Sequence, residues 1–184
     1  MKGRLYAVVI GPLILAGYLM AADNTPLAWP PTLKDGKTVA TETSPSFIQS
    51  SGTLKEGVII AKTAPAVDFL FYPEQNYEGC PWSIWGDGVV AGGKYYSSMG
   101  DHGSVSGKKG VLGNAFVFEY DPGAKTLRTV VDVRKTVAVP TNEYCPGKVH
   151  GRIDTGDDGW LYFSTHRGDG GGTTDKYGYK GDWV

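Results

Sequence analysis

The sequence lacks the features that mark several common classes of protein. Its 184 residues carry 18 lysines and arginines against 19 aspartates and glutamates, so nucleic acid is not expected as a partner. It contains neither the CxxCH motif of c-type haem attachment nor the GxSxG turn of serine hydrolases. No helical hydrophobic period runs through residues 23–184, while 27 glycines and 12% aromatic residues are typical of a β-rich protein with tight turns.

The first 22 residues have the layout of a secretory signal peptide. Lys2 and Arg4 form a short positive region, residues 5–19 are uncharged and mostly apolar, and Ala21-Ala22 precedes the polar chain. A single-pass anchor is the alternative, because this stretch is just long enough to be considered as a span. No cysteine follows the apolar run, which argues against a lipid anchor. We expect a periplasmic or secreted protein with no membrane segment beyond the signal.

A repeat with a spacing of about 65 residues organises the rest of the chain. The segment CPWSIWGD (residues 80–87) recurs in altered form as CPGKVHGR (residues 145–152). Each copy is followed by a glycine turn and an aromatic strand, GGKYYSS (residues 92–98) in the first and DGWLYFS (residues 158–164) in the second. Two divergent copies of strand, turn and aromatic strand predict an array of similar sheets.

Cysteine is scarce, since Cys80 and Cys145 are the only two. Export would allow them to form a disulfide. They occupy equivalent positions in the repeat, and in a radial array such positions are farther apart than the ~7 Å between Cα atoms that a disulfide tolerates. We expect two free thiols, with a Cys80–Cys145 disulfide as the alternative.

Short runs of alternating or β-branched residues, bounded by turn residues, predict the strands. They are residues 38–41, 57–61, 67–72, 83–91, 94–99, 115–120 and 126–133. Gly92-Gly93 and DPGAK (residues 121–125) are the expected turns. The last four runs therefore predict one four-stranded antiparallel meander.

Four-stranded meanders in series predict an all-β protein built from β-propeller blades. A β-sandwich is the alternative, but it does not account for the repeated pairing of Cys-Pro with a glycine-turn hairpin. We expect a signal peptide at residues 1–22, an irregular leader at residues 23–52 and a partial propeller of about three blades at residues 53–184. Because closure takes about four to eight blades, we expect an incomplete propeller and a fragment of a longer chain.

The three histidines are the candidate metal ligands. His150 lies on the strand before the second glycine turn, whereas His102 and His166 each follow an aromatic strand. In a propeller the strand before the turn lines the central channel, so His150 is also a candidate general base. The expected cofactor is a divalent metal, Mg²⁺, Mn²⁺ or Ca²⁺, and no other.

Residues 148–154 hold the strongest cluster of chemistry-bearing side chains. Alternation along a strand places four polar side chains on one side, those of Lys148, His150, Arg152 and Asp154. Such a row suits a wet channel better than a dry core. Arg152 could hold a substrate carboxylate with two parallel hydrogen bonds, which makes His150 and Arg152 the candidate catalytic residues. The alternative is a structural network in which Arg152 pairs with Asp154 or Asp87.

The hairpin DGWLYF (residues 158–163) resembles the repeat of exported bacterial β-propellers of the virginiamycin B lyase and gluconolactonase-like group. In that group a turn of the type DG-x-hydrophobic-Tyr/Trp-Phe recurs in every blade. The resemblance covers about residues 80–184. It implies a divalent metal, held by histidines and a glutamate near the channel mouth, that assists elimination. His150 is the one position carried over from it.

Two functions are therefore expected. The first is a metal-assisted lyase or lactonase acting on a small carboxylated or sugar-derived substrate. The second is a non-catalytic propeller whose channel or loops bind a protein or a glycan. The enzyme predicts divalent-metal binding that falls in His150→Ala, whereas the binding protein predicts a partner whose affinity is insensitive to chelators.

Overall fold

The computed structural model describes residues 33–50, 52–74, 79, 81–82, 84–103 and 113–184. The strands within these ranges are β1 (Val39–Thr43), β2 (Ala66–Leu70), β3 (Val89–Ala91), β4 (Lys94–Gly100), β5 (Ala115–Asp121), β6 (Thr126–Asp132), β7 (Lys148–Val149), β8 (Asp154–Thr155), β9 (Leu161–Tyr162) and β10 (Thr165–His166). The predicted signal peptide lies outside the described residues.

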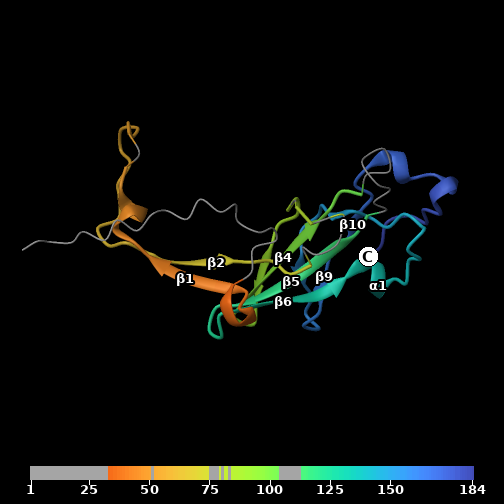
Figure 1. Cartoon of the computed structure of the whole chain (residues 1–184), viewed down its shortest axis with the longest axis horizontal. Coiled ribbons are helices and arrows are strands. Elements are labelled where there is room, and N and C mark those ends of the chain that lie inside the picture. The colour runs from red at the N-terminus through yellow and green to blue at the C-terminus, as the bar shows by residue number, and fades with distance from the viewer. Residues whose placement is uncertain (1–32, 51, 75–78, 80, 83, 104–112) are drawn as a thin grey trace, which may run out of the picture.

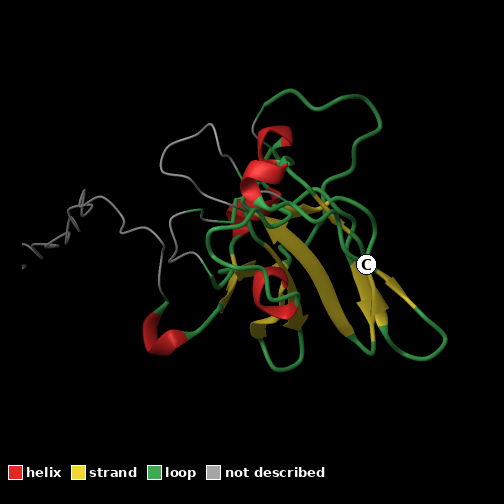
Figure 2. Cartoon of the chain, turned by 90° about the vertical axis from the view of Figure 1, so that its right-hand side faces the viewer, coloured by secondary structure: helices red, strands yellow, loops and turns green. Residues whose placement is uncertain are grey.

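Helices are short and few in this part of the chain. They are the 3₁₀ turns η1 (Lys34–Gly36), η2 (Pro45–Ile48), η3 (Gly170–Gly172) and η4 (Asp175–Tyr177) and the single-turn helix α1 (Val133–Thr136). Figure 2 shows them as brief turns between strands and loops. The all-β prediction is confirmed, and none of the described helices is long and apolar enough to cross a membrane.

The largest sheet is an antiparallel meander in the order β3-β4-β5-β6 (Figure 1). Gly92 and Gly93 join β3 to β4 with φ of 58° and 76°, the left-handed backbone of a two-residue hairpin turn. The carboxylate of Asp121 closes the β5–β6 turn by accepting hydrogen bonds at 2.9 Å from the backbone N–H groups of Gly123 and Ala124. Both turns and the strand order confirm the sequence prediction.

Strand β3 begins at Val89 instead of at the predicted residue 83. The reason lies in two glycines that precede it. A Cβ on Gly86 would lie 2.4 Å from the carbonyl oxygen of Gly151, and one on Gly88 would lie 2.5 Å from the hydroxyl of Tyr95. Gly86 thus packs against the second copy of the repeat and Gly88 against β4, and residues 84–88 do not continue the ladder.

Strand β5 is buried on both faces of the main sheet. On one face Phe116 and Phe118 pack with Val39 and Leu127. On the other face Ala115 packs in a cluster with Val133, Cys145 and Val149. The second Cys-Pro segment thus covers the sheet that the first copy builds. Cys145 is a buried free thiol, as expected, whereas Cys80 lies outside the described residues.

Strands β1 and β2 pair with each other and reach out from the main sheet (Figure 1). Thr38 ties them to β6, because its hydroxyl donates to the carbonyl oxygen of Leu127 at 3.0 Å and accepts from the N–H of Leu127 at 2.9 Å. The predicted runs at residues 38–41 and 67–72 are confirmed as strands, shifted by one or two residues. The predicted leader at residues 23–52 contains η1, η2 and β1, which is the strand predicted within it.

The strand predicted at residues 57–61 does not form. This segment belongs to the loop between η2 and β2, and the side chain of Ile59 is 92% exposed. No described strand pairs with it, so neither a ladder nor a buried face supports extended structure there.

The second copy of the repeat forms two small sheets. β7 pairs with β10 and β8 pairs with β9, each strand being two residues long. The predicted strand at residues 148–154 is interrupted at His150-Gly151, although Val149 and Ile153 are buried on one side as expected. The described residues thus hold one four-stranded and three two-stranded antiparallel sheets, none closed into a barrel.

Candidate functional site

The three histidines come together with a lysine and two tryptophans. The ring centroids of His150 and His166 are 5.2 Å apart, and the charges of both act on the pKa of His102. We call the group the histidine–lysine cluster, and its members are Trp82, Trp85, His102, Lys148, His150 and His166. Sequence reasoning named all three histidines but did not require them to meet.

The β7–β10 ladder places the polar members of the cluster. Lys148 and His166 are directly opposite each other in this ladder, and His150 is the residue after β7. Directly opposite residues of an antiparallel pair have Cβ atoms about 4.5–5.5 Å apart. The ladder therefore fixes the ammonium of Lys148 and the imidazole of His166 as neighbours.

His102 is held in the cluster by its backbone, which is left-handed with φ of 66°. Its N–H donates to the carbonyl oxygen of Gly147 at 2.9 Å, and its carbonyl accepts from the N–H of Asp169 at 2.8 Å. Gly147 and Gly168 pack so closely that a Cβ on either would lie within 2.5 Å of a backbone atom of His102. Histidine is among the residues that tolerate this conformation, which here is imposed by the surrounding backbone.

Two indole rings flank His102. The ring of Trp82 lies 4.7 Å from that of His102, and its Nε1 donates to the carbonyl oxygen of Asp101 at 3.0 Å. The ring of Trp85 lies 5.3 Å from His102 and 5.8 Å from His150. Sequence reasoning missed both tryptophans, although the pattern CPWSIW places them beside the repeated Cys-Pro.

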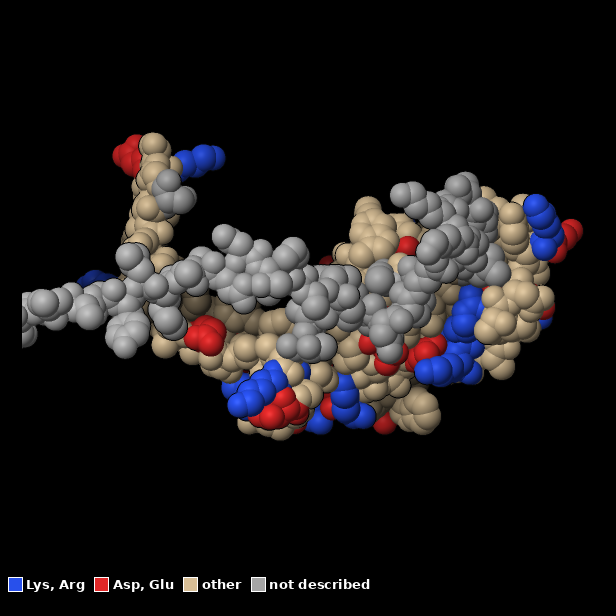
Figure 3. Space-filling model, viewed as in Figure 1, with Lys and Arg blue, Asp and Glu red and all other residues tan. Residues whose placement is uncertain are grey.

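The side chain of Lys148 is 9% exposed, which is unusual for a lysine. Its Nζ lies 4.8 Å from the ring centroid of Trp85. Within the described residues it has no hydrogen bond and no ion pair, whereas Lys94, Lys125, Lys135 and Lys180 each pair with a carboxylate. Figure 3 likewise shows acidic and basic side chains interspersed over the visible face. Among the described residues, Lys148 is thus a buried cation whose one close partner is the ring of Trp85.

The imidazoles of His102 and His166 favour the neutral form. Burial is the main cause of the lowered pKa of each, and the ammonium of Lys148 is the next. The carboxylate of Asp182 opposes this effect at His166. The Nδ1 atom of His166 accepts a hydrogen bond from the N–H of Gly168 at 3.2 Å, so the neutral ring carries its proton on Nε2. The Nε2 atom of His102 is buried and has no hydrogen-bond partner within the part of the chain that the structure describes.

The predicted catalytic pair is only partly brought together. His150 belongs to the cluster, but the side chain of Arg152 is 67% exposed and forms an ion pair with Asp154. This is the pairing of the structural-network alternative. Lys148 also differs from its predicted neighbours, because it is buried while His150, Arg152 and Asp154 are exposed.

The histidines of the cluster were the candidate ligands of a divalent metal. Among the described residues no three His, Cys, Asp or Glu side chains are arranged to hold a metal ion. A metal at the Nε2 of His166 would also displace the proton that the Gly168 hydrogen bond fixes there, and the ammonium of Lys148 would repel it. Metal binding by His102, His150 and His166 stays a prediction.

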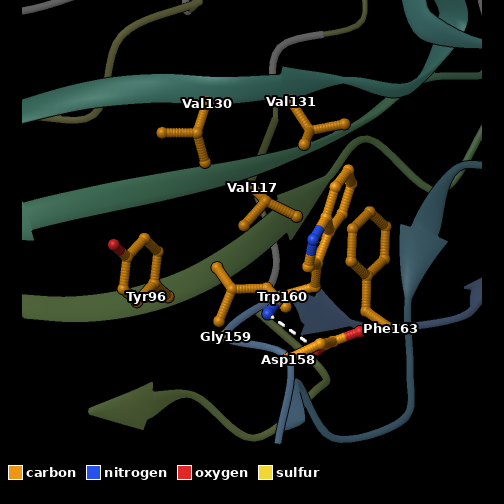
Figure 4. A pocket seen from close by; sticks show the side chains of 9 residues that line it. Tyr96, Val117, Val130, Val131, Asp158, Gly159, Trp160 and Phe163 are labelled. Atoms are coloured by element: carbon orange, nitrogen blue, oxygen red, sulfur yellow. Dashed lines mark hydrogen bonds between the residues drawn. The ribbon is translucent and has the colours of Figure 1, made fainter. Parts of the chain in front are cut away.

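Apart from the histidine–lysine cluster, a hollow of about 370 Å³ lies between the main sheet and the β8–β9 hairpin (Figure 4). Val117, Val131, Trp160 and Phe163 make most of its lining apolar. Its one carboxylate, that of Asp158, is already engaged, because it accepts from the N–H of Trp160 at 3.0 Å and from the hydroxyl of Tyr162 at 2.6 Å. The hollow therefore offers shape without a free polar group.

No protein-family model matches this chain, and no curated protein or solved structure matches it either.

Proposed function

We propose that the protein is an exported β-propeller protein whose histidine–lysine cluster binds a small carboxylated ligand. The antiparallel meander and the repeated Cys-Pro and glycine-turn segments support the propeller. The predicted signal peptide supports export to the periplasm or the cell exterior. The observation that carries the binding site is the buried ammonium of Lys148, which has no ion-pair partner among the described residues.

The burial of Lys148 is costly without a partner. The effective penalty for taking an ion out of water is several kcal/mol, and a desolvated cation–π contact returns about 2 kcal/mol. The contact with Trp85 therefore offsets only part of the penalty. A bound carboxylate would supply the missing counter-charge. The need to bind this ligand would explain why a lysine is present at a buried position.

The neighbouring donors fit a carboxylate. Lys148 presents an ammonium, and His166, directly opposite in the ladder, presents its Nε2–H. Each oxygen of a carboxylate can accept from one of them, and charge-assisted hydrogen bonds of this kind are roughly twice as strong as neutral ones. The indole of Trp85 covers one side of the ammonium, with its ring centroid 4.8 Å from Nζ.

Lyase or lactonase activity is the second candidate, favoured by the unpartnered Nε2 of His102. An imidazole with a low pKa is neutral at pH 7 and has a lone pair that can accept a proton. In an elimination it would take the proton from the carbon next to the bound carboxylate, while a carbon–carbon double bond forms and the leaving group departs with its electron pair. His166 holds the carboxylate in this scheme and is not the base, because its Nε2 already carries a proton.

Isothermal titration calorimetry of the full chain with acetate tests the binding site. Since a charged hydrogen bond is worth about 1.5–3 kcal/mol, Lys148→Met should weaken acetate binding by about tenfold or more. The matched control is Lys135→Met, which removes an exposed lysine paired with Asp132. Equal acetate affinity in Lys148→Met and the unchanged chain would refute the proposal.

Two further measurements separate the enzyme from the binding protein. Base catalysis predicts exchange of the α-hydrogen of a small 3-hydroxy acid for deuterium in D₂O, followed by NMR and lost in His102→Asn. Titration with Mg²⁺, Mn²⁺ and Ca²⁺ tests the metal prediction, which requires uptake that His150→Ala reduces. Acetate binding without exchange and without metal uptake identifies a non-catalytic binding protein.

A further inference from the structure

We infer that the ligand of the histidine–lysine cluster is an acidic sugar, whose carboxylate meets Lys148 and His166 while its ring lies on the indole of Trp82. This inference rests on the proposed carboxylate site and names the class of ligand that it takes. Trp82 belongs to the cluster but has no part in binding the carboxylate.

Trp82 combines exposure with rigidity. Trp82 is 63% exposed. Three interactions still fix the indole: the backbone N–H donates to the carbonyl oxygen of Gly100 at 3.0 Å, Nε1 donates to Asp101, and the ring lies against His102. An aromatic ring that is held in place and open to solvent is a preorganised platform. The side chain is already ordered in the free protein, so ligand binding does not have to pay the entropy cost of ordering it.

His102 and Trp85 connect the platform to the charged donors. His102 contacts the rings of both Trp82 and Trp85, and Trp85 in turn lies under the ammonium of Lys148. A ligand that reaches from Lys148 to Trp82 therefore needs a carboxylate at one end and a flat, weakly apolar face beside it. The face of a pyranose ring has both properties, since its C–H groups carry partial positive charge and the face of an indole is negative.

The polar rim favours a sugar acid over an aromatic acid. Asp182 acts electrostatically on His166, and His150 is exposed at the edge of the cluster. Hydroxyl groups can donate to the carboxylate of Asp182 and bond with the imidazole of His150. An aromatic acid has no hydroxyls to offer these groups, and a second carboxylate would be repelled by Asp182.

Trp160, an exposed tryptophan in the second copy of the repeat, does not have this setting. Trp160 is 72% exposed and lines the apolar hollow, where the carboxylate of Asp158 is engaged by the turn. It is therefore the matched control for Trp82, being a tryptophan of similar exposure without an unpaired cation among its described neighbours.

The test is calorimetric titration of the full chain with D-glucuronate, D-glucose and acetate. We expect glucuronate to bind at least tenfold more tightly than acetate, and glucose to show no binding because it lacks the carboxylate. Trp82→Ala should lower glucuronate affinity to that of acetate, Trp82→Phe should keep most of it, and Trp160→Ala should leave it unchanged. Circular dichroism of each variant checks that the fold is retained.

The outcomes separate this inference from the proposed function. Equal affinity for glucuronate and acetate, both lost in Lys148→Met, would overturn the acidic sugar and leave the carboxylate site standing. Glucuronate affinity that survives Trp82→Ala would also overturn it. If neither anion binds, the carboxylate site itself fails and the acidic sugar fails with it.

Discussion

The ammonium of Lys148 lies 4.8 Å from the ring centroid of Trp85 and has no carboxylate partner among the described residues. Two buried carboxylates among the described residues have partners within the protein: Asp101 accepts hydrogen bonds from the backbone N–H groups of Gly103 and Asn114, and Glu119 forms ion pairs. Glu119 is 6% exposed, but it pairs with Lys94 at 2.9 Å and with Arg128 at 2.8 Å. Glu119 is thus neutralised inside the protein, whereas no described carboxylate pairs with Lys148. That contrast is the reason for proposing a ligand-binding role for Lys148.

Replacing Lys148 with methionine should stabilise the unliganded protein. The change removes a buried cation whose desolvation is uncompensated, and methionine keeps a favourable sulfur contact with the ring of Trp85. We expect the free energy of unfolding to rise by about 1 kcal/mol or more, measured by urea denaturation.

Lys94→Met is the control for this experiment, because we expect it to change the free energy of unfolding in the opposite direction. It removes one of the two cations that neutralise Glu119, so the free energy of unfolding should fall. A lower stability of Lys148→Met would show that the cation–π contact is structural, and the functional interpretation of Lys148 would lose its support.

Stability should fall in two steps as the pH is lowered. The pKa of His102 and of His166 is depressed below the ordinary 6.5, so the folded state binds fewer protons than the unfolded state below that value. Their contribution is fully present above pH 6.5 and is lost as the pH falls below it. Glu119 contributes later, because Arg128 and other partners lower its pKa from 4.5 to about 2.

Urea midpoints measured between pH 8 and pH 5 would show the first step. His102→Asn should flatten it, since asparagine also tolerates the left-handed backbone but does not titrate. If the midpoint stays constant from pH 8 to pH 5 in the unchanged chain, the histidines are not held neutral by the fold.

Binding of a carboxylate should be coupled to proton uptake. A carboxylate beside His102 and His166 favours their charged forms and opposes the burial that lowers each pKa. Acetate affinity should therefore increase as the pH falls from 7.5 to 6. Calorimetry in two buffers of different ionisation enthalpy counts the protons directly, and a result of zero protons would place the ligand away from the histidines.

The main sheet was predictable because its signals are local. Phe116 and Phe118 alternate within one strand, and Gly92-Gly93 specifies a turn between two adjacent runs. The strand predicted at residues 57–61 was wrong because strand formation also depends on residues far away in the sequence. A run such as Val58-Ile59-Ile60 has high strand propensity, but a strand also needs a neighbouring strand to pair with. The sequence of the run does not show whether such a neighbour is present.

The candidate site was only half predictable. Alternation identified His150 and the buried Val149, because the segment is locally extended. It could not separate Lys148 from its exposed neighbours, since the burial of Lys148 depends on Trp85, which is 63 residues earlier in the sequence. The approach of His102 to His166 likewise depends on close packing between glycines of separate segments. The propeller itself stays a prediction.

Gly147→Ala should destabilise the protein and weaken ligand binding together. A Cβ at this position would lie 2.5 Å from the carbonyl carbon of His102 and 2.6 Å from the backbone nitrogen of Gly103, so backbone must move. We expect a loss of about 1–3 kcal/mol in the free energy of unfolding and a weaker acetate affinity, because His102 shifts with its backbone. Gly151→Ala is the control, since its Cβ would meet only the hydroxyl of Ser164 at 3.3 Å. Equal effects of the two substitutions would mean that the left-handed backbone at His102 is not what holds the cluster together.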